Sequence, residues 1–155
     1  MSRSVAASKS RPSRRTAIQF VAYLTYDGNA EAAFDFYARC FDGQVTMRAR
    51  YGEAPPDMPS PPEMRDKMMH VRLEVGDQVL MASDAMAPQC PYTPIKGCSV
   101  SIQFDSPEEA KRIFHALAEG GSVQMPIQPT FWAARFGSLV DRYGVPWMVN
   151  CPPAA

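Results

Sequence analysis

The sequence has no long apolar run, no glycine-rich phosphate loop and no CxxC pair. Its apolar runs span only a few residues, whereas a helix that crosses a bilayer needs about 20, and the N-terminus lacks the apolar core of a signal peptide. No nucleotide-binding fingerprint and no G-x-S-x-G nucleophile elbow occur. These absences argue against a membrane-spanning protein, a P-loop enzyme and a hydrolase with that elbow. We expect a soluble protein of the cytoplasm with no membrane partner.

The four cysteines have no spacing typical of a metal or redox motif; they are Cys40, Cys90, Cys98 and Cys151. A domain of this length buries enough apolar surface to fold without disulfides. We therefore expect reduced thiols with a structural role.

Acidic residues are absent from the first sixteen positions, which hold five of the sixteen Lys and Arg residues. Residues 1–16 also lack apolar periodicity and are predicted to be a disordered basic arm, although an organelle transit peptide has a similar composition. Residues 17–155 carry a net charge of −5 and are predicted to form a single domain. Because a negative body repels a phosphate backbone, we expect no nucleic acid partner.

The first half of the chain predicts strand, helix, strand, strand, strand. Apolar alternation indicates a strand whose inward face holds Ile18, Phe20, Ala22, Leu24 and Tyr26. A helix follows, capped by Asn29 and ended by Gly43 in the left-handed conformation. After a strand over 44–51 and a proline-rich loop over 54–67, strands over 70–75 and 78–83 are joined by a type II′ turn at Gly76-Asp77.

The second half predicts the same order of elements. A strand over 98–104 precedes a helix that opens with a capping box and proline at 106–109 and stops at Gly120-Gly121. Three strands follow near 122–128, 134–140 and 145–151, the last two joined by a type I turn at 141–144. Shifting the chain by 78 residues aligns 27–47 with the second half at eight identities, among them Gly43 with Gly121. This internal duplication predicts an α+β fold of two βαβββ modules, module one over 17–84 and module two over 97–151.

Three motifs carry a resemblance to a known family. Tyr-Leu-Thr-Tyr-Asp-Gly-Asn at 23–29, Leu-Met-Ala-Ser-Asp at 80–84 and Thr-Phe-Trp…Phe-Gly…Asp-x-x-Gly-x-x-Trp at 130–147 resemble the PhnB-like branch of the vicinal oxygen chelate superfamily. That superfamily contains glyoxalases, extradiol dioxygenases and bleomycin-resistance proteins. The resemblance implies that each module curls into a half-barrel of mixed sheet whose concave face lines a cleft.

The resemblance also implies where a metal would bind, namely at Val21, Met81, Ser99 and Met148. Valine and methionine offer no oxygen or nitrogen ligand, and a shifted Gln19 or Gln103 does not replace the set. We therefore expect no metal and no cofactor. Some similar sequences are labelled demethylubiquinone methyltransferase, but this chain lacks the glycine-rich turn and alternating parallel fold of the usual S-adenosylmethionine site.

Strand parity predicts which side chains face the cleft. The turn at Gly76-Asp77 pairs Arg72 with Met81 and His70 with Ser83 on one face, opposite an apolar set that must pack on the helices. The full candidate set is Tyr23, Thr25, His70, Arg72, Glu74, Met81, Ser83, Ser99, Ser101, Gln103, Phe136 and Met148, with Trp132 from a nearby loop.

Each candidate role has a structural alternative. His70 is suited to general acid/base catalysis with Glu74 orienting it, or it belongs to a polar network that only satisfies the cleft. Arg72 binds a small anion, or pairs with Glu74. The aromatic and methionine side chains form apolar walls for a ligand, or they belong to the core. Trp147 is assigned to the core, and His115 is assigned to a helix surface.

The sequence thus favours a binding protein for a small organic ligand, with a metal-free cleft. The alternative is a metal-independent lyase or isomerase that uses His70 as acid and base. A metal-dependent glyoxalase or dioxygenase and a methyltransferase are less favoured. We expect a homodimer, with modules paired within a chain or exchanged between chains, against the alternative of a monomer whose connection over 84–96 is long enough for both modules to fold together.

Overall fold

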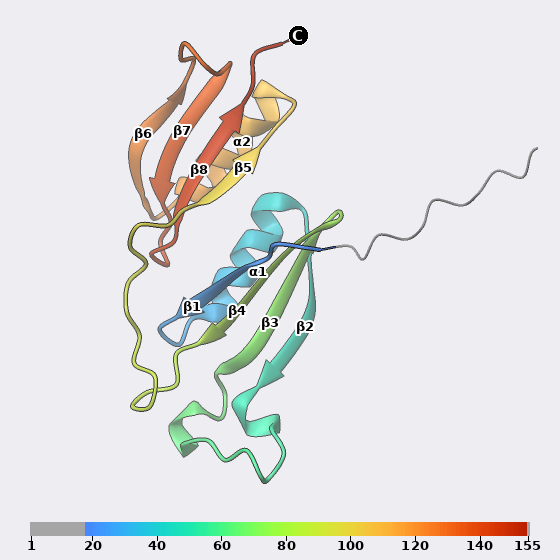
Figure 1. Cartoon of the computed structure of the whole chain (residues 1–155), viewed down its shortest axis with the longest axis vertical. Coiled ribbons are helices and arrows are strands. Elements are labelled where there is room, and N and C mark those ends of the chain that lie inside the picture. Colours follow the sequence, from blue (N-terminus) through green and yellow to red (C-terminus); the bar gives the residue numbers. More distant parts are fainter. Residues whose placement is uncertain (1–17, 155) are drawn as a thin grey trace, which may run out of the picture.

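The structure is a computed structural model that describes residues 18–154. Each half of this range contains one helix and four strands (Figure 1). Module one comprises β1 (Ala22–Tyr26), α1 (Ala30–Phe41), β2 (Gln44–Arg50), β3 (Met68–Val75) and β4 (Gln78–Asp84). Module two comprises β5 (Val100–Gln103), α2 (Pro107–Ala118), β6 (Ser122–Gln128), β7 (Arg135–Val140) and β8 (Pro146–Cys151). One short 3₁₀ turn at Tyr51–Glu53 precedes the proline-rich loop, and a second at Pro62–Met64 lies within it.

The two modules have the same topology. The first sheet has the order β1-β4-β3-β2 and the second has the order β5-β8-β7-β6, with one parallel pair in each. One helix covers one face of each sheet, and the opposite face carries no described helix (Figure 1). The expected α+β duplication is confirmed, but the sheets stay open. No helix in the described part is long and apolar enough to cross a membrane.

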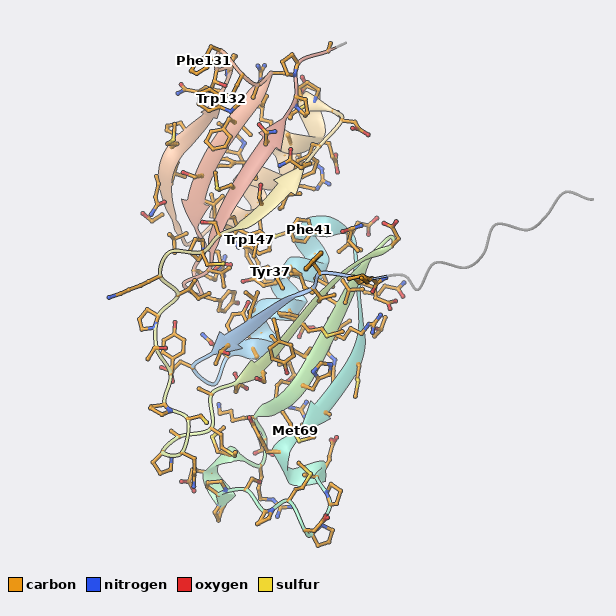
Figure 2. The ribbon with its side chains drawn as sticks, in the orientation of Figure 1. Tyr37, Phe41, Met69, Phe131, Trp132 and Trp147 are labelled. Carbon is orange, nitrogen blue, oxygen red and sulfur yellow. The ribbon has the colours of Figure 1, made fainter. Side chains whose placement is uncertain are left out.

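The modules are joined by a buried polar cluster, which we call the inter-module clamp: Tyr26, Tyr37, Asp141 and Trp147. Tyr26 donates a 2.9 Å hydrogen bond to the Tyr37 hydroxyl, and Tyr37 donates to Asp141 Oδ2. Trp147 Nε1 donates to the same oxygen at 2.8 Å. Asp141 is only 3% exposed, and the tyrosines come from module one, so this carboxylate links the two modules. Figure 2 shows Tyr37, Phe41 and Trp147 gathered at their junction.

Both first strands are shorter than the alternation predicts. β1 begins at Ala22, paired with Leu80, and the expected inward residues Ile18 and Phe20 are 82% and 100% exposed. β4 starts only at Gln78 beside its turn, which leaves little strand for residues before 22 to pair with. β5 begins at Val100, so the predicted strand over 98–104 is too long at both ends.

Both predicted ends of α1 need correction. Asn29 makes no side-chain cap; Asp84 instead accepts from the Ala30 N–H at 2.9 Å and from the Met68 N–H at 2.8 Å. The left-handed residue is Asp42, at φ 54°, and not Gly43. Gly43 is required for another reason, because a Cβ there would lie 2.7 Å from the Glu74 carbonyl oxygen.

Other local predictions are confirmed. Gly76 has φ 59°, as the first central position of a type II′ turn requires. Ser106 caps α2 by accepting from the Glu109 N–H at 3.3 Å. The cysteines are all free, but Cys90 and Cys98 are exposed, so a structural role fits only Cys40 and Cys151.

The predicted arm over 1–16 lies outside the described residues.

Candidate functional site

The helix-free face of the first sheet gathers seven of the predicted site residues. The register places Tyr23, Met81 and Arg72 in one row across β1, β4 and β3, as the parity argument requires. We call this surface the module-one face; it consists of Tyr23, Thr25, His70, Arg72, Glu74, Met81 and Ser83. All seven are exposed or half-buried, whereas Val71, Leu73 and Ala82 on the other parity are fully buried.

Tyr23 and His70 form a pair on this face. The Tyr23 hydroxyl lies 3.1 Å from His70 Nδ1, and the two rings stack at 5.7 Å with an interplanar angle of 28°. Because Nδ1 is engaged by the hydroxyl, Nε2 is the nitrogen left for a ligand. Sequence reasoning named Glu74 as a possible partner of His70, whereas the hydrogen-bond partner in the structure is Tyr23.

Glu74 instead pairs with Arg72. The Arg72 Nε and Nη2 atoms lie 3.2 and 3.0 Å from Glu74 Oε1. The guanidinium is thereby neutralised within the face, and its remaining N–H groups are the ones that can donate to a ligand.

The second sheet carries a neutral counterpart. Ser101, Gln103, Phe136, Ser138, Met148 and Asn150 share its helix-free side, which we call the module-two face. Asn150 Nδ2 donates to Gln103 Oε1 at 2.8 Å, and Gln103 Nε2 donates to Ser101 Oγ at 3.1 Å. The buried Asn150 Oδ1 has no partner among the described residues. Sequence reasoning missed Asn150, although alternation from Met148 along β8 would have found it. Ser99, predicted on this face, precedes the strand and is exposed.

Trp132 reaches the module-two face from the β6–β7 loop. Its ring meets Phe136 edge-on at 5.4 Å, and Phe131 packs on Trp132 at 4.7 Å while being 96% exposed itself. Phe136 is only 9% exposed yet lies outside the main core cluster, because it is covered by this loop. Trp147, by contrast, is core, as predicted.

The two faces occupy equivalent positions of the duplicated fold, and their chemistry differs. Matching the registers makes His70 equivalent to Phe136 and Arg72 equivalent to Ser138, while Met81 and Met148 occupy the same central place. Every ionisable side chain of the module-one face therefore has a neutral equivalent in module two. Within residues 18–154 no hydrogen bond, ion pair or ring contact joins the two faces.

The implied metal does not fit these residues. Met81 and Met148 supply only thioether sulfur, a poor ligand for zinc, nickel, manganese or iron, and Val21 supplies nothing. The described residues also contain no group of three His, Cys, Asp or Glu side chains arranged to hold a metal ion. No step of a reaction is therefore assigned to a metal.

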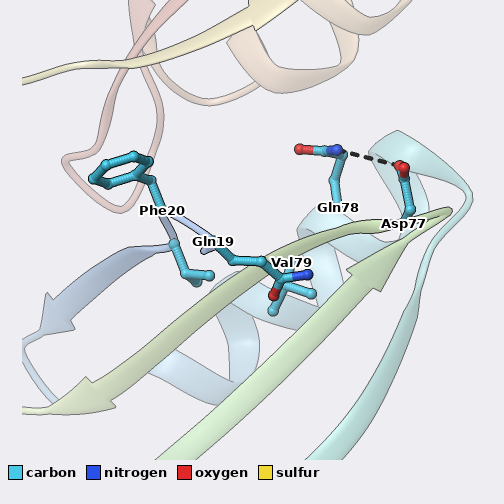
Figure 3. Close-up of a pocket in the computed structure, with 6 residues that line it drawn as sticks. Gln19, Phe20, Asp77, Gln78 and Val79 are labelled. Carbon is cyan, nitrogen blue, oxygen red and sulfur yellow. Dashed lines mark hydrogen bonds between the residues drawn. The ribbon is translucent and has the colours of Figure 1, made fainter. Parts of the chain in front are cut away.

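Two pockets lie beside the faces, and the larger one reaches Ser101 and Gln103 of the module-two face. The smaller, about 270 Å³, sits where residues 19–21 pass the β3–β4 turn (Figure 3). Gln78 donates to Asp77 at 3.2 Å on its rim. The larger, about 590 Å³, lies between the modules.

A protein-family model described as "3-demethylubiquinone-9 3-methyltransferase" matches residues 18–150. The chain belongs to this family. It is the PhnB-like branch of the vicinal oxygen chelate superfamily, as the sequence motifs indicated.

Three relatives share both sequence and length with the chain. "Protein YjdN" of Escherichia coli K12 is 32% identical over 137 residues, which cover 83% of this chain and 91% of that protein. The crystal structure of protein PA1353 from Pseudomonas aeruginosa is 51% identical with a TM-score of 0.80, covering 88% and 98% of the two chains. A Bacillus cereus PhnB protein, described as a putative 3-demethylubiquinone-9 3-methyltransferase, is 27% identical with a TM-score of 0.71, covering 86% and 99%.

More distant structures share the fold alone. A glyoxalase-related enzyme from Fulvimarina pelagi is 18% identical with a TM-score of 0.59, covering 88% and 90% of the chains. The fosfomycin resistance protein FosX from Listeria monocytogenes is 9% identical with a TM-score of 0.60, covering 90% and 96%. The glyoxalase and bleomycin-resistance type of fold is thereby established for this chain.

Proposed function

We propose that the protein binds a small organic molecule on its open sheet faces without using a metal ion. The observation that carries the proposal is the contrast between the faces: ionisable groups on one, and amides, two hydroxyls and aromatic rings on the other. The module-one face suits a polar group that contacts His70 and Arg72, and the module-two face suits a flatter, less polar group that contacts Trp132.

Methionine at both central positions supports binding without a metal. Met81 and Met148 place soft, adaptable side chains where a metal-dependent relative would need oxygen or nitrogen ligands. Isothermal titration of the full chain with zinc, nickel, manganese and ferrous ions is expected to show no tight stoichiometric site. A one-to-one site of submicromolar affinity that Met81→Leu abolishes would overturn this part of the proposal.

The binding role is tested with a ligand recovered from the natural source by native mass spectrometry of the full chain. We expect that ligand to be released unchanged after incubation. His70→Gln is expected to retain less of it than the wild type, whereas His115→Gln, which alters the exposed histidine of α2, retains as much. Equal retention by both variants would contradict the site.

We propose further that the protein is a homodimer of the cytoplasm. Both sheets are open and leave polar faces and an exposed Phe131–Trp132 pair for a second copy to cover. The exposed free thiols of Cys90 and Cys98 are compatible with a reducing compartment. Light scattering should give twice the 17.2 kDa of one chain at micromolar concentration. A monomer mass that persists on concentrating the sample would remove the dimer.

One observation favours an enzyme as the second candidate, namely the Tyr23–His70 pair. A hydroxyl at 3.1 Å from Nδ1 fixes the imidazole and leaves Nε2 to move a proton on the ligand, as a metal-independent lyase or isomerase requires. The test is turnover of the recovered ligand, with Tyr23→Phe as the positioning variant. An enzyme predicts a shifted pH profile in Tyr23→Phe and loss of turnover in His70→Gln. Unchanged ligand after prolonged incubation excludes it.

The methyltransferase in the family's description is not part of our proposal. Each described sheet has a single parallel strand pair, whereas the usual S-adenosylmethionine site follows the first strand of an alternating parallel fold. A thermal shift assay with S-adenosylmethionine is expected to leave the melting temperature unchanged. A saturable rise in melting temperature, abolished by a substitution on either face, would restore that activity as a candidate.

A further inference from the structure

The larger of the two pockets lies in the slot between the modules, at the edge of the module-two face. It has a volume of about 590 Å³, within the range of about 300–1,000 Å³ usual for small-molecule sites. Edge strands β1 and β5 border it, and all four residues of β5 contribute to its wall. Its floor includes Phe41 and Trp147, which pack at 5.7 Å where the modules meet (Figure 2).

The chemistry of the slot differs from that of both faces. None of the twelve residues that line it is charged. Aromatic and aliphatic side chains form most of the lining, and Gln78, Ser101 and Gln103 are its polar members. Since β5 pairs only with β8, its second edge also turns unpaired backbone N–H and C=O groups toward the slot. A ligand here would meet apolar surface on one side and hydrogen-bonding groups on the other.

Phe20 gives a second, independent indication. This ring is 100% exposed at the rim, although phenylalanine is among the residues that gain most free energy from burial. It lines both pockets, so it stands where a molecule in the slot would contact it.

We propose that this inter-module slot is a second binding site, for a flat, uncharged, largely apolar molecule with hydrogen-bonding groups along one edge. The slot shares Ser101 and Gln103 with the module-two face, but its other ten lining residues belong to neither face, and the proposal does not depend on a ligand bound to the faces.

Two other occupants fit the slot less well. Residues 1–17 are close in sequence to Phe20 of the slot, but they are rich in arginine and serine, and the lining offers no carboxylate to pair with their five basic residues. A second copy would present the charged module-one face or the exposed Phe131–Trp132 loop, and the first of these cannot enter an uncharged slot without losing hydration. Both remain outcomes of the test.

The test uses Nile red, an uncharged, flat and fluorescent molecule with a carbonyl group, added to the full chain. The matched pair of variants is Phe20→Ser and Phe131→Ser, which remove rings that are 100% and 96% exposed, one at the slot and one at the far end of module two. Phe20→Ser is expected to weaken binding about tenfold, the loss of one aromatic contact. Phe131→Ser should bind as the wild type does. Ala22→Glu, which puts a charge on the exposed wall of the slot, should abolish binding.

A second readout locates the probe. In Trp132→Phe, Trp147 is the only tryptophan of the chain, and bound Nile red should quench its emission. The proposal is overturned if the wild type binds no probe, if Phe20→Ser and Phe131→Ser behave alike, or if Ala22→Glu binds normally. It is also overturned if NMR signals of residues 1–17 move on titration or if the probe changes the oligomeric mass. If His70→Gln weakens Nile red binding and Phe20→Ser does not, the probe lies on the sheet face, and the slot fails while the proposed function stands.

Discussion

The inter-module clamp should make the stability of the whole chain depend on one hydroxyl. Tyr37 accepts from Tyr26 and donates to Asp141, so Tyr37→Phe removes a hydrogen bond to a charged acceptor and leaves the Tyr26 hydroxyl without its partner. Both tyrosines are about 1% exposed or less, so water does not replace the lost contacts. The carboxylate keeps Trp147 Nε1 at 2.8 Å and the Val145 N–H at 3.0 Å, so the turn itself should survive.

The magnitudes follow from these contacts. A hydrogen bond to a charged group contributes about 1.5–3 kcal/mol, and an unsatisfied buried hydroxyl costs about 1–3 kcal/mol. Tyr37→Phe should therefore lower the free energy of unfolding by about 3–4 kcal/mol, whereas Tyr26→Phe removes one neutral bond and should cost about 1 kcal/mol. In the double variant neither residue has a buried hydroxyl without a hydrogen-bond partner. Its free energy of unfolding should therefore fall by about 2–3 kcal/mol, less than that of Tyr37→Phe alone.

Urea denaturation followed by circular dichroism measures all four proteins under the same conditions. The decisive quantity is the coupling free energy between the two substitutions. We expect the double variant to lose about 2 kcal/mol less than the sum of the two single losses. Tyr143→Phe is the control, since that hydroxyl makes only a long, exposed contact of 3.4 Å to the Ala32 carbonyl oxygen. Strictly additive costs, or a Tyr37→Phe cost no larger than that of Tyr143→Phe, would refute the reasoning.

Three further predictions concern the clamp tyrosines, the buried Cys40 thiol and two glycines of the backbone. Burial raises the pKa of both clamp tyrosines well above 10.0, so above pH 10 the folded state holds protons that the unfolded chain releases. The free energy of unfolding should therefore fall by up to about 1.4 kcal/mol per pH unit per tyrosine above pH 10. Equal urea midpoints at pH 9 and 11 would contradict this. Burial raises the pKa of the Cys40 thiol to about 11, so iodoacetamide at pH 8 should label Cys90 and Cys98 and spare Cys40, as mass spectrometry of the peptides would show. Gly121→Ala should lower the free energy of unfolding, measured with urea, by about 3 kcal/mol or more, because its Cβ would lie 2.3 Å from a carbonyl oxygen. Gly97→Ala meets no atom within 4 Å and should lower it by about 1 kcal/mol because of the positive φ. Equal costs would contradict the steric argument.

The sequence predicted the order of elements because alternation and helical periodicity are local signals. The Ser106 cap of α2 and the register of the β3–β4 hairpin follow from such signals and are confirmed. The ends of α1 do not follow, since the group that caps it is Asp84, which lies 54 residues away from Ala30 along the chain. No local pattern reports a cap supplied by another strand.

Site residues were predictable in part for the same reason. Parity along a strand placed His70, Arg72 and Glu74 on one face, but it could not say which side chains would pair. Tyr23 reaches His70 because β1 and β3 flank β4 on either side, a fact of sheet order rather than of sequence. The buried Asp141 was visible only as a turn residue, although it holds the two modules together.

The duplication explains how two kinds of surface arise from one fold. The glycine that follows each helix is kept in both modules because a side chain there would collide with a strand backbone, at Glu74 of β3 in one and at Val140 of β7 in the other. No such constraint acts on the helix-free faces, where side chains stand clear of the core and a change costs little stability. Histidine and arginine in module one therefore stand where module two has phenylalanine and serine. The same freedom extends to the edge strands β1 and β5, which differ in length and border an uncharged slot. Recognition by this protein should accordingly reside in what the two modules do not share, and substitutions that make one face resemble the other, such as His70→Phe, should alter ligand retention without unfolding the chain.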